Sequence, residues 1–207
     1  MTKPPARYLL APLFAIQFFA WSAMFCLWIY ALPVIGQIVQ PGSAEPADYR
    51  RMLILVSVGF AFYSVLGTSL SLLIPRLVER SGNGVVLGLG LWIGAGGFAL
   101  LGVVTRVGWI GPAFAAIGIA WSVMSSIPYA LASAAAPDGR GALFMRLFGF
   151  STVLPQVVTT LGLALLGSAW FGADIGRVML LASVSMGIAG AIALAFRGRF
   201  AVLAEPW

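Results

Sequence analysis

Six long apolar segments, separated by short stretches that hold most of the charge, constrain this chain more than any other feature. They cover residues 8–39, 52–77, 84–104, 107–136, 142–171 and 177–196. A helix needs about 20 apolar residues to cross the hydrocarbon core of a bilayer, so each segment can span a membrane once. The first segment is longer than the apolar stretch of a secretory signal, and we expect it to remain in the mature protein. The sequence therefore predicts an all-α membrane protein, a single domain of six transmembrane helices over residues 1–207.

The composition excludes a soluble enzyme. Only 9% of the residues are charged and 61% are hydrophobic, whereas soluble domains carry about 25% charged residues. The chain has no histidine and one cysteine, Cys26, which removes imidazole catalysis, histidine metal ligands and disulfides. We expect no enzymatic activity, no metal and no cofactor. The formal net charge of +6 comes from scattered basic residues rather than from one basic face, so we expect no nucleic-acid partner.

Lysine and arginine indicate how the predicted spans are oriented. The side that holds both termini carries Lys3, Arg7, Arg76, Arg80, Arg140, Arg146, Arg197 and Arg199, and the opposite side carries only Arg50, Arg51, Arg106 and Arg177. Positive charge is in excess on the cytoplasmic side of membrane proteins. We therefore expect both termini in the cytoplasm and the chain in the bacterial inner membrane. Aromatic residues near the expected outer ends, where rings favour the interface, agree with this: Trp28, Tyr30, Trp109 and Trp170.

Acidic residues are absent from the interior of every predicted span. They are Glu45, Asp48, Glu79, Asp138, Asp174 and Glu205. Carboxylates embedded in a membrane are the usual proton or cation relays, so this chain alone lacks the standard group for ion coupling. Arg146 lies about one turn inside its span, and snorkelling of its side chain to the surface is favoured over a role in a cavity.

Uncharged polar and aromatic side chains mark the first, second, fourth and fifth segments, and the second segment places Ser57, Ser64, Thr68 and Ser71 on one face. The candidate cavity residues are Gln17, Trp21, Trp28, Tyr63, Ser64, Trp121, Ser125, Tyr129, Thr152 and Gln156. The third and sixth segments carry few such residues, a pattern of period three that a 3+3 repeat would produce. Helix packing is the favoured interpretation for each serine and threonine. For Gln17, Trp21 and Gln156 packing and cavity lining stay open, because an amide in mid-membrane needs a partner.

Glycines concentrate in the third segment. Gly84 and Gly88, and again Gly90 and Gly94, form GxxxG pairs. Such pairs let two membrane helices approach closely. They predict close packing, either within the chain or against a partner.

Several motifs together resemble a known family. They are Gln17-Phe18-Phe19-Ala20-Trp21 running to Trp28-Ile29-Tyr30, then Gly118-Ile119-Ala120-Trp121, Ile127-Pro128-Tyr129-Ala130-Leu131 and Leu154-Pro155-Gln156. In order and spacing they are similar to spans seven to twelve of the sucrose and glycoside transporters of the major facilitator superfamily. The resemblance covers nearly the whole chain.

The resemblance implies a sugar:proton symporter that works by alternating access, with a central cavity shared between two six-helix halves. It also implies that the first, second, fourth and fifth helices of this half line that cavity. Glu79, Arg80 and Gly82 resemble the cytoplasmic gate motif of the superfamily, although Asn83 and Gly84 occupy its two following basic positions. Ser64 stands where the family usually has asparagine, and Arg146 and Gly149 stand where a glycine and an asparagine are expected.

Two functions follow as hypotheses. The chain is either a half-size transporter subunit for sugars or related small solutes, paired with a second six-helix half or with a copy of itself, or a transporter-derived accessory subunit of a larger respiratory or photosynthetic membrane complex. Transport is favoured because of the resemblance. The partly altered motifs and the absence of embedded acids favour the second reading.

Overall fold

The structure, a computed structural model, describes residues 7–40, 49–136, 141–171 and 174–201, and all regular secondary structure within these residues is helical. Six helices are long and apolar enough to cross a membrane, which confirms the prediction of an all-α chain with six helices of membrane-spanning length. These are α1 (Arg7–Val39), α2 (Tyr49–Ser71), α4 (Asn83–Val103), α5 (Ile110–Ala135), α6 (Gly141–Phe171) and α7 (Gly176–Ala195). Three short elements accompany them: α3 (Ile74–Ser81), η2 (Val107–Trp109) and α8 (Arg197–Ala201).

Some residues that enter the predicted charge and aromatic pattern lie outside this description. Six charged residues are outside the described residues: Lys3, Glu45, Asp48, Asp138, Arg140 and Glu205. The side chains of Arg7 and Trp170 are also outside them.

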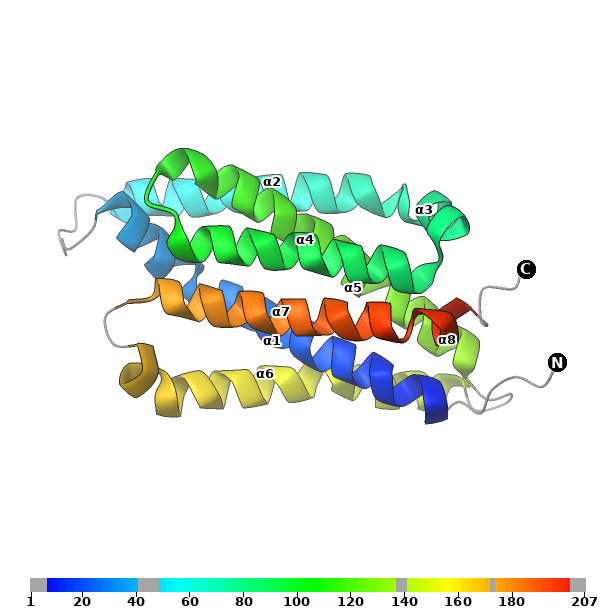
Figure 1. The fold of residues 1–207 in the computed structure, drawn as a ribbon. Coiled ribbons are helices and arrows are strands. Elements are labelled where there is room, and N and C mark those ends of the chain that lie inside the picture. The colour runs from blue at the N-terminus through cyan, green and yellow to red at the C-terminus, as the bar shows by residue number, and fades with distance from the viewer. Residues whose placement is uncertain (1–6, 41–48, 137–140, 172–173, 202–207) are drawn as a thin grey trace.

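The long helices lie side by side, and α1 begins at the end of the bundle where α7 ends (Figure 1). The short helices α3 and α8 lie at that same end (Figure 1).

The second predicted segment differs from the structure. It was expected to run as one helix over residues 52–77, but α2 already starts at Tyr49 and ends at Ser71, and α3 begins at Ile74. Pro75 lies in the first turn of α3, where its missing N–H is not needed. Inside a continuous helix the same proline would remove a hydrogen bond and clash with the preceding turn. The chain instead makes a tight turn in which Leu73 N–H donates to Leu70 O at 2.8 Å.

Four of the long helices form the packed centre of the bundle. Helix α4 packs against α5 and α7, and α7 also packs along α1. Helix α2 packs mainly on α5, and α6 packs mainly on α1. The most apolar window of α1 is 56% buried, whereas the corresponding windows of α2 and α6 are only 17% and 22% buried. Helices α2 and α6 are thus the least covered of the six.

The glycines of α4 account for much of this packing. A Cβ atom at Gly88 would lie 2.5 Å from Leu194 Cγ of α7, and one at Gly90 would lie 2.7 Å from Val123 Cγ2 of α5. A Cβ atom at Gly94 would overlap Ala120 of α5, and one at Gly84 would lie 2.6 Å from the Cα of Arg197. The two GxxxG pairs therefore face different neighbours in the same chain, and both serve internal packing.

Side-chain hydrogen bonds fasten α7 to the rest of the bundle. Ser185 Oγ donates to Phe19 O of α1 at 2.7 Å, and Ser183 Oγ donates to Ala95 O of α4 at 2.8 Å. Both serines of the last span thus serve helix packing, the usual use of serine in membrane helices.

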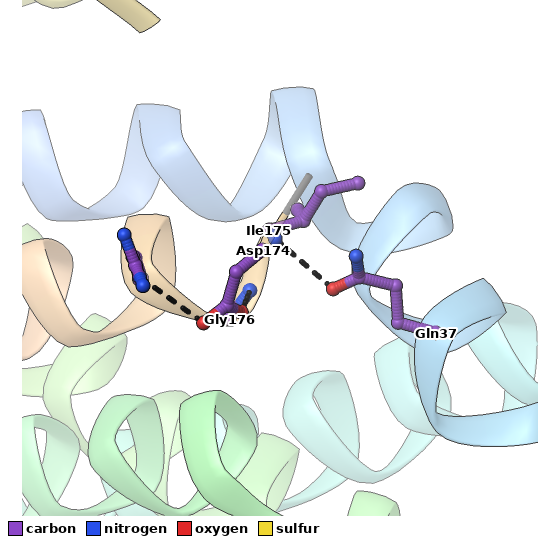
Figure 2. Close-up of polar contacts among 5 residues, drawn as sticks. Gln37, Asp174, Ile175 and Gly176 are labelled. Carbon is purple, nitrogen blue, oxygen red and sulfur yellow. Dashed lines mark hydrogen bonds and ion pairs between the residues drawn. The ribbon is translucent and has the colours of Figure 1, made fainter. Parts of the chain in front are cut away.

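The start of α7 is also held by polar groups, which Figure 2 shows. Gln37 Oε1, near the end of α1, accepts a hydrogen bond from the backbone N–H of Ile175 at 3.0 Å. Asp174 Oδ1 accepts from the N–H of Gly176 at 3.1 Å, and Asp174 Oδ2 accepts from Arg177 Nε at 3.2 Å. The first N–H groups of a helix have no partner within it, so Gln37 and Asp174 together cap α7 and tie it to α1.

Candidate functional site

A polar pocket of about 240 Å³ lies between α2 and α5. It is lined by Tyr63, Ser64, Gly67, Thr68 and Ser71 from α2 and by Trp121, Ser122 and Ser125 from α5. None of these lining residues carries a charge. In a chain this apolar, a hollow lined by hydroxyl groups and two aromatic rings is the best candidate for a binding site.

Two facing glycines bring the pocket's helices together. A Cβ atom at Gly67 would lie 3.1 Å from Gly118 O, and a Cβ atom at Gly118 would overlap the backbone of Tyr63. Only glycine therefore allows α2 and α5 to cross so closely. The larger side chains one turn away on either helix then surround a hollow beside the crossing point.

The hydroxyl groups of the pocket have hydrogen-bonding capacity left. Ser125 Oγ lies 2.7 Å from Trp121 O and donates to it, and Ser71 Oγ donates to Thr68 O at 2.7 Å. Each hydroxyl oxygen still has lone pairs that can accept a hydrogen bond. The pocket can therefore accept hydrogen bonds from a ligand and offer it aromatic faces, with no charge to favour an ion.

Trp121 connects this pocket to α1. Its ring centroid lies 5.4 Å from that of Trp21, 5.8 Å from that of Trp28 and 5.9 Å from that of Tyr63. The two pairs with α1 are edge-to-face and the pair with Tyr63 is tilted, and aromatic pairs of this kind are attractive beyond the area they bury. Three predicted site residues, two from α1 and one from α2, thus converge on Trp121 of α5. Trp28 was also expected near the outer end of its span. It lies within this aromatic cluster, and α1 continues beyond it to Val39.

Gln17 lies next to this aromatic cluster along α1 and is fully buried. Its side chain is 0% exposed, and that of Trp21, one turn further along α1, is 8% exposed. One turn before Gln17, the ring of Phe14 packs edge-to-face on Phe148 of α6 at 5.5 Å. Gln17 is therefore placed on the face of α1 that meets α5 and α6.

Several buried polar atoms at this junction have no hydrogen-bond partner among the described residues. They are Gln17 Oε1 and Nε2, Trp21 Nε1, Ser122 Oγ and Ser151 Oγ. Leaving such a group unpaired costs about 1–3 kcal/mol. The amide of Gln17 is the largest of these groups, and both its donor and its acceptor lack a partner among the described residues.

Tyr129 and Thr152 join α5 to α6. Tyr129 Oη and Thr152 Oγ1 lie 3.0 Å apart in a hydrogen bond, and the Tyr129 ring packs edge-to-face on Phe148 at 5.3 Å. Gln156 follows one turn after Thr152 on α6, and its side chain is exposed. It lies outside the residues that line the pocket.

The predicted residues thus fall into three groups. Tyr63, Ser64, Trp121 and Ser125 line the pocket, Trp21 and Trp28 contact Trp121, and the others lie elsewhere, Gln17 on α1, Tyr129 on α5, and Thr152 and Gln156 on α6. The list of site residues omitted Thr68, Ser71 and Ser122, which also line the pocket. For Thr68 and Ser71 the signal was present, because positions 64, 68 and 71 recur at helical spacing.

Glu79, Arg80 and Gly82 lie at the end of α3, away from the pocket. Glu79 and Arg80 are exposed. Gly82 has φ of +82° and donates its N–H to Val78 O at 2.8 Å, which ends α3. Glycine adopts this backbone conformation without steric cost, so Gly82 has a structural role at the turn between α3 and α4.

A larger hollow of about 380 Å³ lies between α1, α6 and α7. Its lining is dominated by apolar side chains, such as those of Phe18, Phe19, Leu163 and Ile188. It offers few groups that could orient a polar solute. The smaller pocket between α2 and α5 is therefore the better candidate site.

Within the described part of the chain, no group of three or more Cys, Asp or Glu side chains is placed to hold a metal ion. Comparison with protein-family models and with curated proteins finds no match for this chain. The pocket and its surroundings therefore supply the functional argument.

Proposed function

We propose that this chain is one six-helix half of a major facilitator-type carrier for sugars or related small uncharged solutes. It works by alternating access after pairing with a second half, which is either another chain or a copy of itself. The observation that carries this proposal is the uncharged pocket between α2 and α5, lined by hydroxyl groups and by the rings of Tyr63 and Trp121. A sugar presents hydroxyl groups around its rim and an apolar ring face, and this lining offers a partner for each.

The size of the pocket supports pairing. Its volume of about 240 Å³ lies below the roughly 300–1,000 Å³ of a complete ligand pocket. Ser64, Thr68 and Ser71 are exposed at its edge. A second half facing α2 would close the pocket and add the missing lining.

The exposed polar residues of the least covered helices support the same arrangement. Ser64 and Thr68 on α2, and Gln156 and Thr160 on α6, are exposed in helices that are long enough to cross the bilayer. Polar side chains in spans usually face a bundle interior or a water-filled cavity. A second half that covers α2 and α6 would provide such surroundings.

The proposed carrier has a defined orientation in the membrane and a defined symmetry. Both termini face the cytoplasm of a bacterial inner membrane, in keeping with the charge count along the chain. The first three spans and the last three are related as repeats, and the two halves of the carrier are related by an axis along the membrane normal.

The test is solute uptake by proteoliposomes that contain this chain together with any partner that copurifies with it. Labelled neutral sugars are expected to enter faster than charged solutes of similar size. Ser64→Ala should reduce uptake severalfold, because Ser64 lines the pocket. Ser57→Ala is the matched control, since Ser57 is also exposed on α2 but lies outside the pocket lining. Uptake no faster than into empty vesicles would end the proposal.

The second candidate is an accessory subunit of a larger membrane complex, without transport activity. The observation in its favour is that all acidic residues lie outside the long apolar segments, so the chain has no embedded carboxylate for ion coupling. The composition of the particle purified from native membranes separates the two functions. Isolation alone or with one second half supports the carrier, and isolation only within a large complex supports the accessory subunit.

A further inference from the structure

Helix α3 lies at one end of the bundle (Figure 1), and exposed leucine and arginine side chains lie in this helix and at its N-cap. Ile74 is buried and Val78, one turn later, is half-buried, which fixes the inward face of the helix against α4. Leu73 and Leu77 are 45% and 39% exposed. Arg76 and Arg80, also one turn apart, are exposed with them. A short helix with exposed apolar and basic side chains is typical of the membrane interface.

Helix α8 adds two more arginines beside the start of α4. Arg197 and Arg199 are both exposed, and the guanidinium carbon of Arg199 lies 4.7 Å from the centre of the Phe196 ring. The backbone of Arg197 packs on Gly84, since a Cβ atom there would lie 2.6 Å from the Arg197 Cα. Gly82 connects α3 to α4 two residues earlier. The arginines of α3 and α8 therefore flank the same helix start, and within these two helices they outnumber the single carboxylate, Glu79.

We propose that α3 and α8 form a docking surface for the headgroups of anionic phospholipids in the leaflet at this end of the bundle. A guanidinium binds phosphate oxygens through two parallel hydrogen bonds. Arg76, Arg80, Arg197 and Arg199 supply these groups, and Leu73 and Leu77 contact the upper part of the acyl chains. The exposed leucines favour a lipid over a soluble anion, because a soluble anion gains nothing from them.

The described arginines at the opposite end of the bundle are placed differently. Arg50 and Arg51 begin the long helix α2, and Arg106 precedes the three-residue η2. Arg177 is paired with Asp174 at 3.2 Å. Exposed apolar side chains lie near Arg50, Arg51 and Arg106 as well, but a short amphipathic helix does not carry these arginines. They therefore serve as a control for arginines beside apolar side chains outside such a helix.

The test measures how many phosphatidylglycerol molecules stay bound to the full chain, by native mass spectrometry after extraction from mixed phosphatidylglycerol and phosphatidylcholine vesicles. Each arginine of the docking surface is expected to strengthen phosphatidylglycerol binding about fivefold. The Arg76→Gln/Arg80→Gln and Arg197→Gln/Arg199→Gln variants are each expected to weaken phosphatidylglycerol binding at least about tenfold. The Arg50→Gln/Arg51→Gln control should change it less than threefold. Equal losses in the control, or no loss in either test variant, would overturn the proposal.

A second variant separates a lipid from a soluble anion. Leu73→Ser/Leu77→Ser keeps every arginine and should also weaken phosphatidylglycerol binding severalfold. Full binding in this variant, with displacement of the lipid by millimolar inorganic phosphate, would show an anion site and contradict the proposal. Circular dichroism checks that each variant keeps the helix content of the parent chain. Because the two arginine pairs are changed in separate variants, a folding defect in one variant leaves the other variant to test the proposal.

Discussion

Helix α4 and helix α2 have similar lengths and similar hydropathy, yet they are used in different ways. Both have a mean hydropathy of 1.9 in their most apolar window, but half of that window is buried in α4 and 17% in α2. Glycines on α4 accept close neighbours from α5 and α7. Helix α2 approaches α5 closely where Tyr63 and Gly67 meet Gly118, and it leaves a row of hydroxyl groups uncovered.

The difference separates what stabilises the bundle from what it can bind. Lipid is as apolar as leucine, so helices associate in a membrane through close packing and hydrogen bonds rather than through hydrophobicity. The region around α4 has both close packing and hydrogen bonds, and these contacts are made within the chain. The α2 region, like α6, carries polar groups that the chain itself does not cover, and these are the groups that we propose contact a second half and a solute.

The largest effect is expected from Gly94→Val in α4. Its side chain would overlap Ala120, which is fixed to the backbone of α5. Overpacking of this kind costs about 1–3 kcal/mol or more, so thermal stability in detergent should fall by several degrees and the protein should aggregate more readily. The matched control is Gly96→Ala, since a Cβ atom there has no neighbour within 4 Å. Equal loss in both variants would contradict the packing assigned to Gly94.

Gly118→Ala tests the crossing of α2 and α5. The added methyl group would overlap the backbone of Tyr63 and push the two helices apart. We predict a loss of stability of about 1–2 kcal/mol together with a larger relative loss of solute uptake, because the pocket lies beside this crossing. Gly162→Ala in α6, where a Cβ atom meets nothing within 4 Å, should leave both properties unchanged. Unaltered uptake in Gly118→Ala would show that transport does not depend on the pocket.

Asp174→Ala tests the cap of α7. The change removes the acceptor of the Gly176 N–H, and loss of such a cap costs about 1 kcal/mol. Chemical denaturation of the chain in mixed micelles measures this cost. Arg177→Gln removes only the exposed ion pair with Asp174, which is worth at most about 0.5 kcal/mol. If the two substitutions cost the same, the cap contributes nothing.

Gln156→Leu should have the smallest effect on the isolated chain and a clear effect on the carrier. Its side chain is exposed on α6, so the free energy of unfolding should change by less than about 0.5 kcal/mol. Pairing with the second half should weaken severalfold, as measured by the fraction of paired particles in size-exclusion chromatography. Destabilisation of the isolated chain with unchanged pairing would place Gln156 inside the bundle instead.

Hydropathy predicted the six helices well, because length and apolar composition suffice to identify a membrane span. The break between Ser71 and Ile74 was missed, since the apolar run continues through it and only Pro75 marks the new helix. The bond from the Gln37 side chain to the N–H of Ile175 joins segments far apart in the sequence, and no local pattern points to it.

The site was predictable in part for similar reasons. Helical spacing placed Ser64, Thr68 and Ser71 on one face, and the structure brings that face to Trp121 and Ser125. Spacing did not show that Gln17 would be fully buried while Gln156 would be exposed. Periodicity defines a face of a helix, but the neighbour that covers this face depends on how the whole bundle packs.

The central claim is that the pocket between α2 and α5 binds a neutral solute during transport, and Trp121 is the residue that tests it most directly. Trp121 lines the pocket and contacts α1 and α2, whereas Trp109 is an exposed tryptophan of η2 outside it. Initial rates of sugar uptake into proteoliposomes should fall at least about tenfold in Trp121→Ala, a loss of about 1.4 kcal/mol, and remain near the parent rate in Trp109→Ala. Equal rates in the two variants would contradict the claim.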